Sequence, residues 1–86
     1  MGYELFITPR ARKQMRRLPV EVAVRIRKQL DALCDSPRRN ALDVKKLTGR
    51  DGYRLRVGDY RVIYEIEDKK LIVVVLEVGH RKNIYQ

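Results

Sequence analysis

The chain contains 86 residues and carries a formal net charge of +9, because 20 lysines and arginines stand against 11 aspartates and glutamates. This length leaves room for one small domain, residues 1–86, and excludes a second. The charge favours a polyanionic partner, either nucleic acid, an acidic protein or an anionic membrane surface. With one cysteine and one histidine, the chain has too few ligands for a zinc site.

Nothing in the sequence points to a membrane or to secretion. The longest apolar run, residues 71–76, is far shorter than the roughly 20 residues of a membrane helix. No apolar stretch follows the N-terminal methionine as in a secretory signal, and the lone Cys34 has no disulfide partner within the chain. We therefore expect a cytoplasmic protein in which Cys34, on the apolar face of a helix, is a small buried hydrophobe and not a nucleophile.

The first part of the chain predicts a strand followed by two helices. Residues 2–8 are rich in strand-forming side chains, and Thr8-Pro9 is typical of a helix start, with threonine as the N-cap. Apolar residues then recur at helical spacing, interrupted by Leu18-Pro19, so the two helices are expected to form a hairpin ending near residues 35–37. The first helix carries five cations, which are either a solvated face or a contact to an anionic partner.

The segment 38–52 is polar and is expected to be a loop. A short turn of helix or strand is possible within it near residues 43–47, and Gly49-Arg50-Asp51-Gly52 is a tight-turn signal.

Residues 53–64 form the clearest motif, two alternating runs separated by Gly58-Asp59. This pair suits a two-residue hairpin turn with a positive φ at its first position. If Val57 and Tyr60 flank the turn as partners, the alternation of side chains directs an apolar set toward the core. That set is Tyr53, Leu55, Val57, Tyr60, Val62 and Tyr64. The opposite face then gathers Arg54, Arg56 and Arg61.

Three arginines in one cross-strand neighbourhood repel one another, which suggests that an anion binds there. The alternative is that Glu65, Glu67 or solvent counter-ions relieve the repulsion, as on the exposed face of many sheets. The pattern of residues leaves both possibilities open.

The remaining residues predict two strands after the hairpin turn. A strand over residues 60–66 leads through a polar turn to residues 71–78, which are apolar at nearly every position, as expected for a central strand covered on both faces. The predicted fold class is α+β. An N-terminal strand and an α-helical hairpin precede a three-stranded antiparallel meander, which forms one small sheet with the helices on one face.

The available side chains favour one class of reaction. Glycine-rich phosphate loops and metal-ligand sets are absent from the sequence, and only His80 is available as the base of a catalytic triad. Cations and tyrosines suit attack of an RNA 2′-hydroxyl on the adjacent phosphate, because the substrate supplies the nucleophile and the protein supplies charge and geometry. His80 is a candidate proton relay or a plain surface histidine. Tyr85 is a candidate base, a stacking platform for a nucleobase, or a hydrophobic contact.

Several segments together carry a resemblance to a known family. They are the Leu18-Pro19 break, Lys-Leu-Thr-Gly at residues 46–49, the hairpin at 53–64 and the ending Val-Gly-His-Arg-Lys-Asn-Ile-Tyr at 78–85. With the order of elements, they resemble the RelE/ParE superfamily of bacterial and archaeal toxins over nearly the whole chain. In that superfamily RelE members are ribosome-dependent mRNA endonucleases, whereas ParE members poison DNA gyrase without a comparable nuclease site.

The RelE-type resemblance implies a catalytic set. Carried over position by position, it comprises Arg54, Arg56, Arg61, Arg81 and Tyr85. The tyrosine would act as general base toward the 2′-hydroxyl, and the basic residues as transition-state stabilisers and leaving-group acid. Lysine is usual where Arg54 and Arg56 stand here, and arginine is a weaker acid catalyst. We therefore add His80, beside the expected site, as a candidate source of that proton.

The resemblance also implies partners. It implies a type II toxin–antitoxin system without a cofactor or metal, in which an acidic RelB-like antitoxin neutralises the toxin in a hetero-oligomer. Ribosome and mRNA would be the targets, with RNA phosphates contacted by Arg10, Arg12, Lys13, Arg16, Arg17, Lys45, Lys46 and Arg50. The alternatives are a ParE-like gyrase inhibitor and a nucleic-acid-binding module without chemistry.

Overall fold

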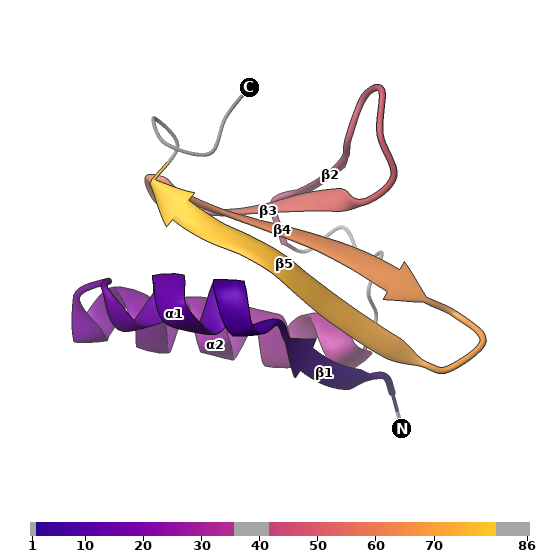
Figure 1. Ribbon diagram of the computed structural model, residues 1–86, viewed down its shortest axis with the longest axis horizontal. Coiled ribbons are helices and arrows are strands. Elements are labelled where there is room, and N and C mark those ends of the chain that lie inside the picture. Colours follow the sequence, from indigo (N-terminus) through magenta and orange to yellow (C-terminus); the bar gives the residue numbers. More distant parts are fainter. Residues whose placement is uncertain (1, 36–41, 81–86) are drawn as a thin grey trace.

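The computed structural model describes residues 2–35 and 42–80 (Figure 1). Its elements are β1 (Glu4–Ile7), α1 (Pro9–Arg16), α2 (Val20–Asp35), β2 (Val44–Lys46), β3 (Tyr53–Val57), β4 (Tyr60–Glu67) and β5 (Ile72–His80). The strands form one sheet in the order β1-β5-β4-β3-β2. The predicted α+β class, the helical hairpin and the antiparallel meander are confirmed. The predicted sheet consisted of the N-terminal strand and the meander. The observed sheet has one more strand, because β2 pairs with β3.

The helix boundaries follow the capping signals. Thr8 is the N-cap of α1, since its Oγ1 accepts a hydrogen bond from the N–H of Ala11 at 3.2 Å, and Pro9 begins the helix. The same hydroxyl donates to the carbonyl of Val75 at 2.8 Å, which ties the helix start to β5. Leu18-Pro19 separates α1 from α2, as predicted.

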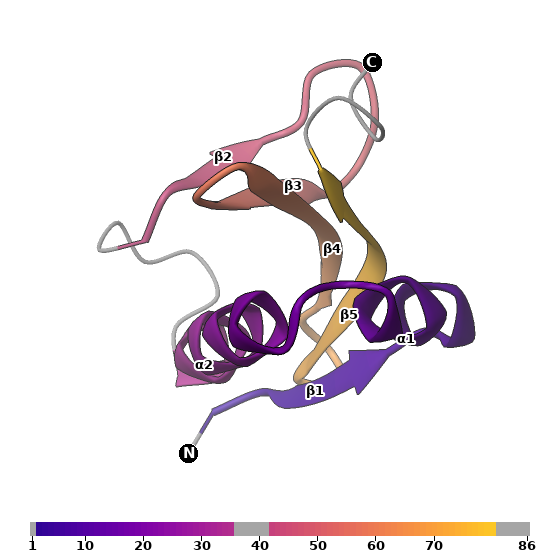
Figure 2. The same cartoon turned by 90° about the vertical axis from the view of Figure 1, so that its left-hand side faces the viewer.

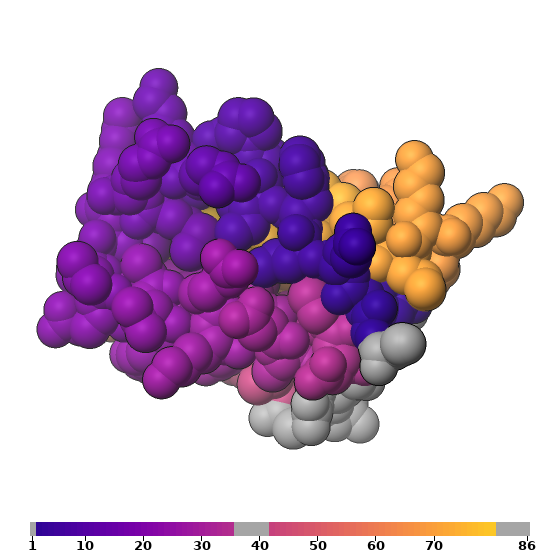
Figure 3. Space-filling view, turned by 90° about the horizontal axis from the view of Figure 1, so that it is seen from below, coloured from indigo at the N-terminus to yellow at the C-terminus, as the bar shows by residue number. Residues whose placement is uncertain are grey.

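Both helices lie beneath the twisted sheet, and β2 and β3 lie at the end farthest from β1 (Figures 1 and 2). Seen from below, α1 and α2 cover most of the underside, and the β4–β5 turn projects at one side (Figure 3). The core between the layers contains Ile7, Ala11, Ile26, Leu30, Leu33, Leu55, Val57, Val62, Tyr64, Val73, Val75 and Val78. Burial of these side chains supplies the main force that holds the helices to the sheet.

The prediction that the last strand is covered on both faces was wrong. Val73, Val75 and Val78 are buried on the helix side, whereas Val74 and Leu76 are only half-buried. The helices cover one face alone, so the second face of β5 is left without a packed layer. A shift in the β4–β5 register at Ile63–Tyr64 keeps Val78 on the helix side.

Cys34 packs against the core while remaining half-buried, in agreement with the predicted small hydrophobe. Burial raises the pKa of its thiol above the ordinary value, and the nearby carboxylates of Asp31 and Asp35 raise it further. A thiol held in this form is a poor nucleophile. Within residues 2–35 and 42–80, no helix has the length and apolar character needed to cross a membrane.

Candidate nucleic-acid interface

The hairpin at residues 53–64 has the predicted register. Val57 pairs with Tyr60 and Arg56 with Arg61, and Gly58 adopts the positive φ of 60° that the turn requires. Leu55, Val57, Val62 and Tyr64 are buried, while Tyr53 and Tyr60 at the two ends are half-buried. The alternation of side chains therefore places Arg54, Arg56 and Arg61 on the face that the helices do not cover.

We call this arrangement the arginine face, defined by Arg54, Arg56 and Arg61 together with Lys45, which pairs with Arg54 from β2. The Arg54 side chain is 17% exposed and that of Arg56 is 45% exposed. Ile63 lies on the same face opposite Arg54 and is nevertheless buried. The alkyl stems of arginines on a sheet pack over such an apolar neighbour.

Asp43 is the residue that sequence reasoning missed. Its Oδ1 lies 3.6 Å from an Nη of Arg54, and its Oδ2 lies 4.0 Å from Nε of Arg56. The predicted counter-ions were Glu65, Glu67 or solvent. Aligning residues 44–46 with residues 53–55 as an antiparallel pair would have revealed Asp43, because it directly precedes β2 and falls opposite Arg56. The main-chain carbonyl of Asp43 accepts a hydrogen bond from the N–H of Arg56 at 2.9 Å.

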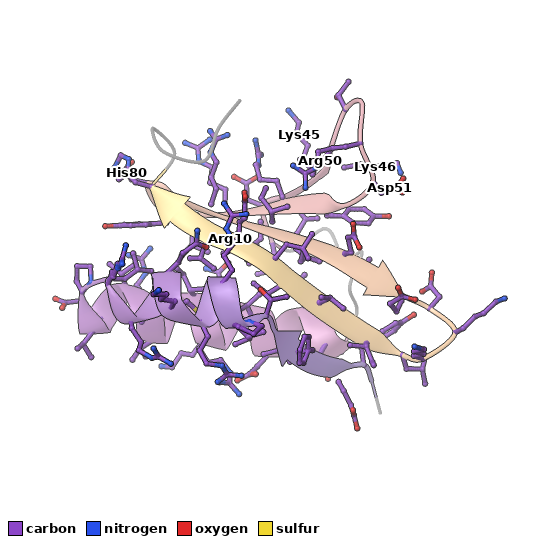
Figure 4. The ribbon with its side chains drawn as sticks, in the orientation of Figure 1. Arg10, Lys45, Lys46, Arg50, Asp51 and His80 are labelled. Carbon is purple, nitrogen blue, oxygen red and sulfur yellow. The ribbon has the colours of Figure 1, made fainter. Side chains whose placement is uncertain are left out.

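Arg10 links α1 to the same side of the sheet. Its Nη donates to Oε2 of Glu77 at 2.9 Å, and Glu77 pairs with Ile63 on the arginine face. Figure 4 shows Arg10 rising from α1 toward β5. Among the predicted RNA contacts on α1, Arg10 is thus tied to this side of the sheet by an ion pair.

The other predicted RNA contacts form two separate groups. Lys45, Lys46 and Arg50 are exposed on β2 and on the loop that follows, and Figure 4 shows them together at the β2 end of the sheet. The Lys46 ammonium also lies 5.7 Å from the ring centroid of Tyr53. Arg12, Lys13, Arg16 and Arg17 are exposed on or directly after α1, away from this loop.

A groove of about 420 Å³ runs between α1 and α2 on the underside of the molecule. Its floor is apolar and includes Met15, Leu18 and Val24, and its rim carries Arg12, Arg16 and Arg27. Val24 and Val20 are exposed there to 47% and 77%. Two of the predicted RNA-binding cations, Arg12 and Arg16, thus border an apolar surface.

His80 lies beside Tyr60 at the end of β5. The two residues pair in the ladder, and their rings meet edge to face with centroids 5.4 Å apart. Since Tyr60 and Arg61 point to opposite faces, the register assigns His80 to the side opposite Arg61. His80 is therefore near the arginine face only at the strand end, and its role as a proton relay stays a prediction.

Arg81 and Tyr85, the two remaining candidates, lie outside the described residues. Among residues 2–35 and 42–80, no group of three potential ligands gathers in the way that a metal ion requires. The arginine face offers several guanidinium donors for phosphate oxygens, and such donors stabilise negative charge without needing to exchange a proton.

The fold and the site define a class: a small basic α+β protein with a helical hairpin under the sheet and a set of arginines on the other face. The family model described as the ParE toxin of the parDE type II toxin–antitoxin system matches residues 5–85, and the chain belongs to this family.

Relatives and solved structures agree with this assignment. The chain is 36% identical to the mRNA interferase toxin RelE of Escherichia coli K12, over 95% of this chain and 86% of the relative. It is 32% identical to the toxin RelG of Mycobacterium tuberculosis, over 100% and 99% of the two chains. The toxin fold in the archaeal RelE–RelB complex from Pyrococcus horikoshii matches with a TM-score of 0.83 at 34% identity, covering 96% of this chain and 99% of that one.

Proposed function

We propose that this protein is the toxin of a type II toxin–antitoxin system and acts as a metal-independent mRNA interferase. In this role, as one domain in the cytoplasm, it cleaves mRNA in the ribosomal A site and stops translation. The observation that carries the proposal is the arginine face, built by β3 and β4, in a chain similar over most of its length to mRNA interferases. A gyrase inhibitor has no need for such a set of phosphate-binding cations on one face of the sheet.

The proposed reaction uses the RNA's own nucleophile. The 2′-oxygen attacks the adjacent phosphorus, the bond to the 5′-oxygen breaks, and a 2′,3′-cyclic phosphate and a 5′-hydroxyl are formed. A base takes the 2′-hydroxyl proton, and an acid returns a proton to the leaving oxygen. Tyr85 is the proposed base, and His80 or Arg81 the proposed acid.

Arg54, Arg56 and Arg61 have a different part in this reaction. They bind the non-bridging phosphate oxygens and stabilise the extra negative charge of the transition state, because guanidinium groups keep their protons throughout the physiological pH range. Lys45, on the same face, and Arg50, in the loop after β2, extend this cationic surface along a phosphate backbone, whereas Lys46 pairs with Tyr53 and lies on the other face of β2.

The proposed partner is an acidic RelB-like antitoxin. The structural neighbours include RelE–RelB complexes from Pyrococcus horikoshii, Mycobacterium tuberculosis and Methanococcus jannaschii. The groove between α1 and α2, with its apolar floor and its rim of Arg12, Arg16 and Arg27, suits an amphipathic segment that carries carboxylates along its edges. Its capture would be fast at low salt and slower as salt screens the attraction.

The test is cleavage of a programmed mRNA on purified ribosomes by wild type, Arg81→Ala and Tyr85→Phe. Arg27→Ala serves as the control, because it removes a cation from the helical side of the molecule. Cleavage by wild type and the control, lost in the other two variants, supports the proposal. A folded wild type that cleaves nothing but inhibits gyrase-catalysed DNA supercoiling would favour the ParE-type alternative.

A further inference from the structure

Asp43 places one carboxylate between two arginines of the arginine face. Each of its two oxygens faces a different guanidinium, Oδ1 toward Arg54 and Oδ2 toward Arg56. The backbone fixes the position of Asp43. Its main-chain carbonyl accepts a hydrogen bond from the N–H of Arg56 at 2.9 Å, and the next residue, Val44, pairs with Leu55. The carboxylate is therefore held against the arginines by the ladder and not by its own contacts alone.

The contacts of this carboxylate are loose. Distances of 3.6 and 4.0 Å exceed the roughly 2.7–2.9 Å of a charge-assisted hydrogen bond. The Asp43 side chain is 55% exposed, and Nε of Arg54 is buried without a hydrogen-bond partner among the described residues. Asp43 thus balances charge on the arginines while leaving part of their donor capacity unused.

A phosphodiester resembles this carboxylate in the features that matter. It presents two negatively charged oxygens close together on one atom, and it binds guanidinium groups at shorter range when it reaches them directly. A phosphate that bridges Arg54 and Arg56 would need the space and the charge position that the Asp43 carboxylate now has. The exposed carboxylate has room to move toward solvent.

We propose that Asp43 is an internal competitor of the RNA phosphate. In the free protein it neutralises Arg54 and Arg56 and lowers the repulsion on the arginine face, and the bound RNA displaces it. This inference rests on the proposed function, because it identifies the place between these arginines as a phosphate position. The competition weakens binding to any RNA or other polyanion that is not positioned well enough to replace the carboxylate.

The proposal predicts opposite effects of Asp43→Asn on binding and on stability. Without the competing charge, the affinity for RNA rises by about three- to tenfold at low salt, as expected from the loss of two exposed charge contacts. This gain shrinks as added salt screens the charges. The same change leaves the arginines uncompensated, so the thermal midpoint falls by about 2–5 °C. A purely structural role would lower the thermal midpoint without raising the affinity.

The experiment measures fluorescence anisotropy of a labelled single-stranded RNA whose 2′-hydroxyls are methylated, so that it binds without being cleaved. Wild type is compared with Asp43→Asn and with Glu67→Gln. The second variant removes the same unit of charge from the other end of β4, where the exposed Glu67 pairs with Ile72 of β5 and not with a residue of the arginine face. Tighter binding by Asp43→Asn and unchanged binding by Glu67→Gln are expected.

A second pair of variants tests the mechanism. In an Arg54→Ala background, Asp43→Asn should increase the affinity much less, because one of the two groups for which the carboxylate competes is gone. An equal rise in RNA affinity in Asp43→Asn and Glu67→Gln would assign the effect to net charge and overturn the proposal. Weaker, unchanged or undetectable RNA binding by Asp43→Asn would also overturn it. The ribosome assay distinguishes failure of the proposed function from failure of this inference. If the protein does not cleave mRNA but the variants show the expected binding pattern, the nuclease function is refuted and the competition between Asp43 and RNA phosphate is not.

Discussion

Arg56 and Arg61 are directly paired across the β3–β4 ladder, so two guanidinium groups share one cross-strand position. Like charges that face each other in a sheet are destabilising. The nearby Asp43 carboxylate offsets part of the repulsion at Arg56, at a distance of 4.0 Å. The Arg56–Arg61 pair therefore lowers the stability of the sheet in the free protein and concentrates positive charge at its surface.

Arg61→Ala should separate catalysis from folding. Removing one charge of the pair relieves repulsion, and losing the half-buried alkyl stem costs packing, so the free energy of unfolding should stay within about 1 kcal/mol of wild type. Cleavage on ribosomes should fall by about 100-fold or more, as for the loss of a donor to a developing oxyanion. Urea unfolding and the ribosome assay measure the two effects. Strong destabilisation would mark Arg61 as a structural residue.

Gln14→Ala should destabilise the sheet at the point where β1 ends. Oε1 of Gln14 accepts the N–H of Val78 at 2.7 Å, beyond the last β1–β5 pair at Ile7 and Val75. Without this acceptor, a part-buried backbone donor is left unsatisfied, which costs about 1–3 kcal/mol in urea unfolding. Gln14→Glu retains an oxygen acceptor and is the control. Equal stability of the alanine variant and wild type would show that water replaces the amide.

Leu71→Gly should stabilise the protein. Leu71 has a φ of +56° in the turn before β5, where a side chain costs about 1–2 kcal/mol, and it is 52% exposed. Glycine removes this strain, and the added entropy of the unfolded chain offsets part of the gain. The thermal midpoint should rise by a few degrees, whereas Leu71→Ala, which keeps the Cβ, should bring no such rise. A lower midpoint for the glycine variant would mean that the leucine contacts outweigh the strain.

Cys34 should make stability depend on pH in the alkaline range. Burial, followed by Asp31 and Asp35, raises the pKa of its thiol, so the folded state holds the proton more tightly than the unfolded chain. The contribution of the protonated Cys34 thiol to the free energy of unfolding is complete below the ordinary thiol pKa of about 8.5. It is lost as the pH rises through the raised pKa of the folded state. Chemical unfolding between about pH 8 and 10 should show a steeper loss for wild type than for Cys34→Ala. Parallel curves would contradict this assignment.

Short-range patterns were sufficient for much of the fold and for the centre of the site. The Gly58-Asp59 turn and the alternation on either side fix the β3–β4 register, which alone places Arg54, Arg56 and Arg61 on one face. The Thr8-Pro9 start and the Leu18-Pro19 break likewise depend on neighbouring residues, because caps and turns are satisfied within a few positions of the chain.

Contacts between distant parts of the chain needed the folded structure. Gln14 and Val78 are 64 residues apart, the parallel pairing of β1 with β5 joins the two ends of the described chain, and Asp43 reaches Arg54 only because β2 adds to the sheet edge. No local pattern encodes the contact of Gln14 or the pairing of β1, since they depend on how whole elements pack and on which polar groups remain unsatisfied after packing. The contact of Asp43 could have been found by pairing residues 44–46 with residues 53–55, but only once residues 44–46 are recognised as a strand. The arginines could therefore be predicted from the hairpin, while their acidic counterpart, Asp43, became evident only when β2 was placed beside β3.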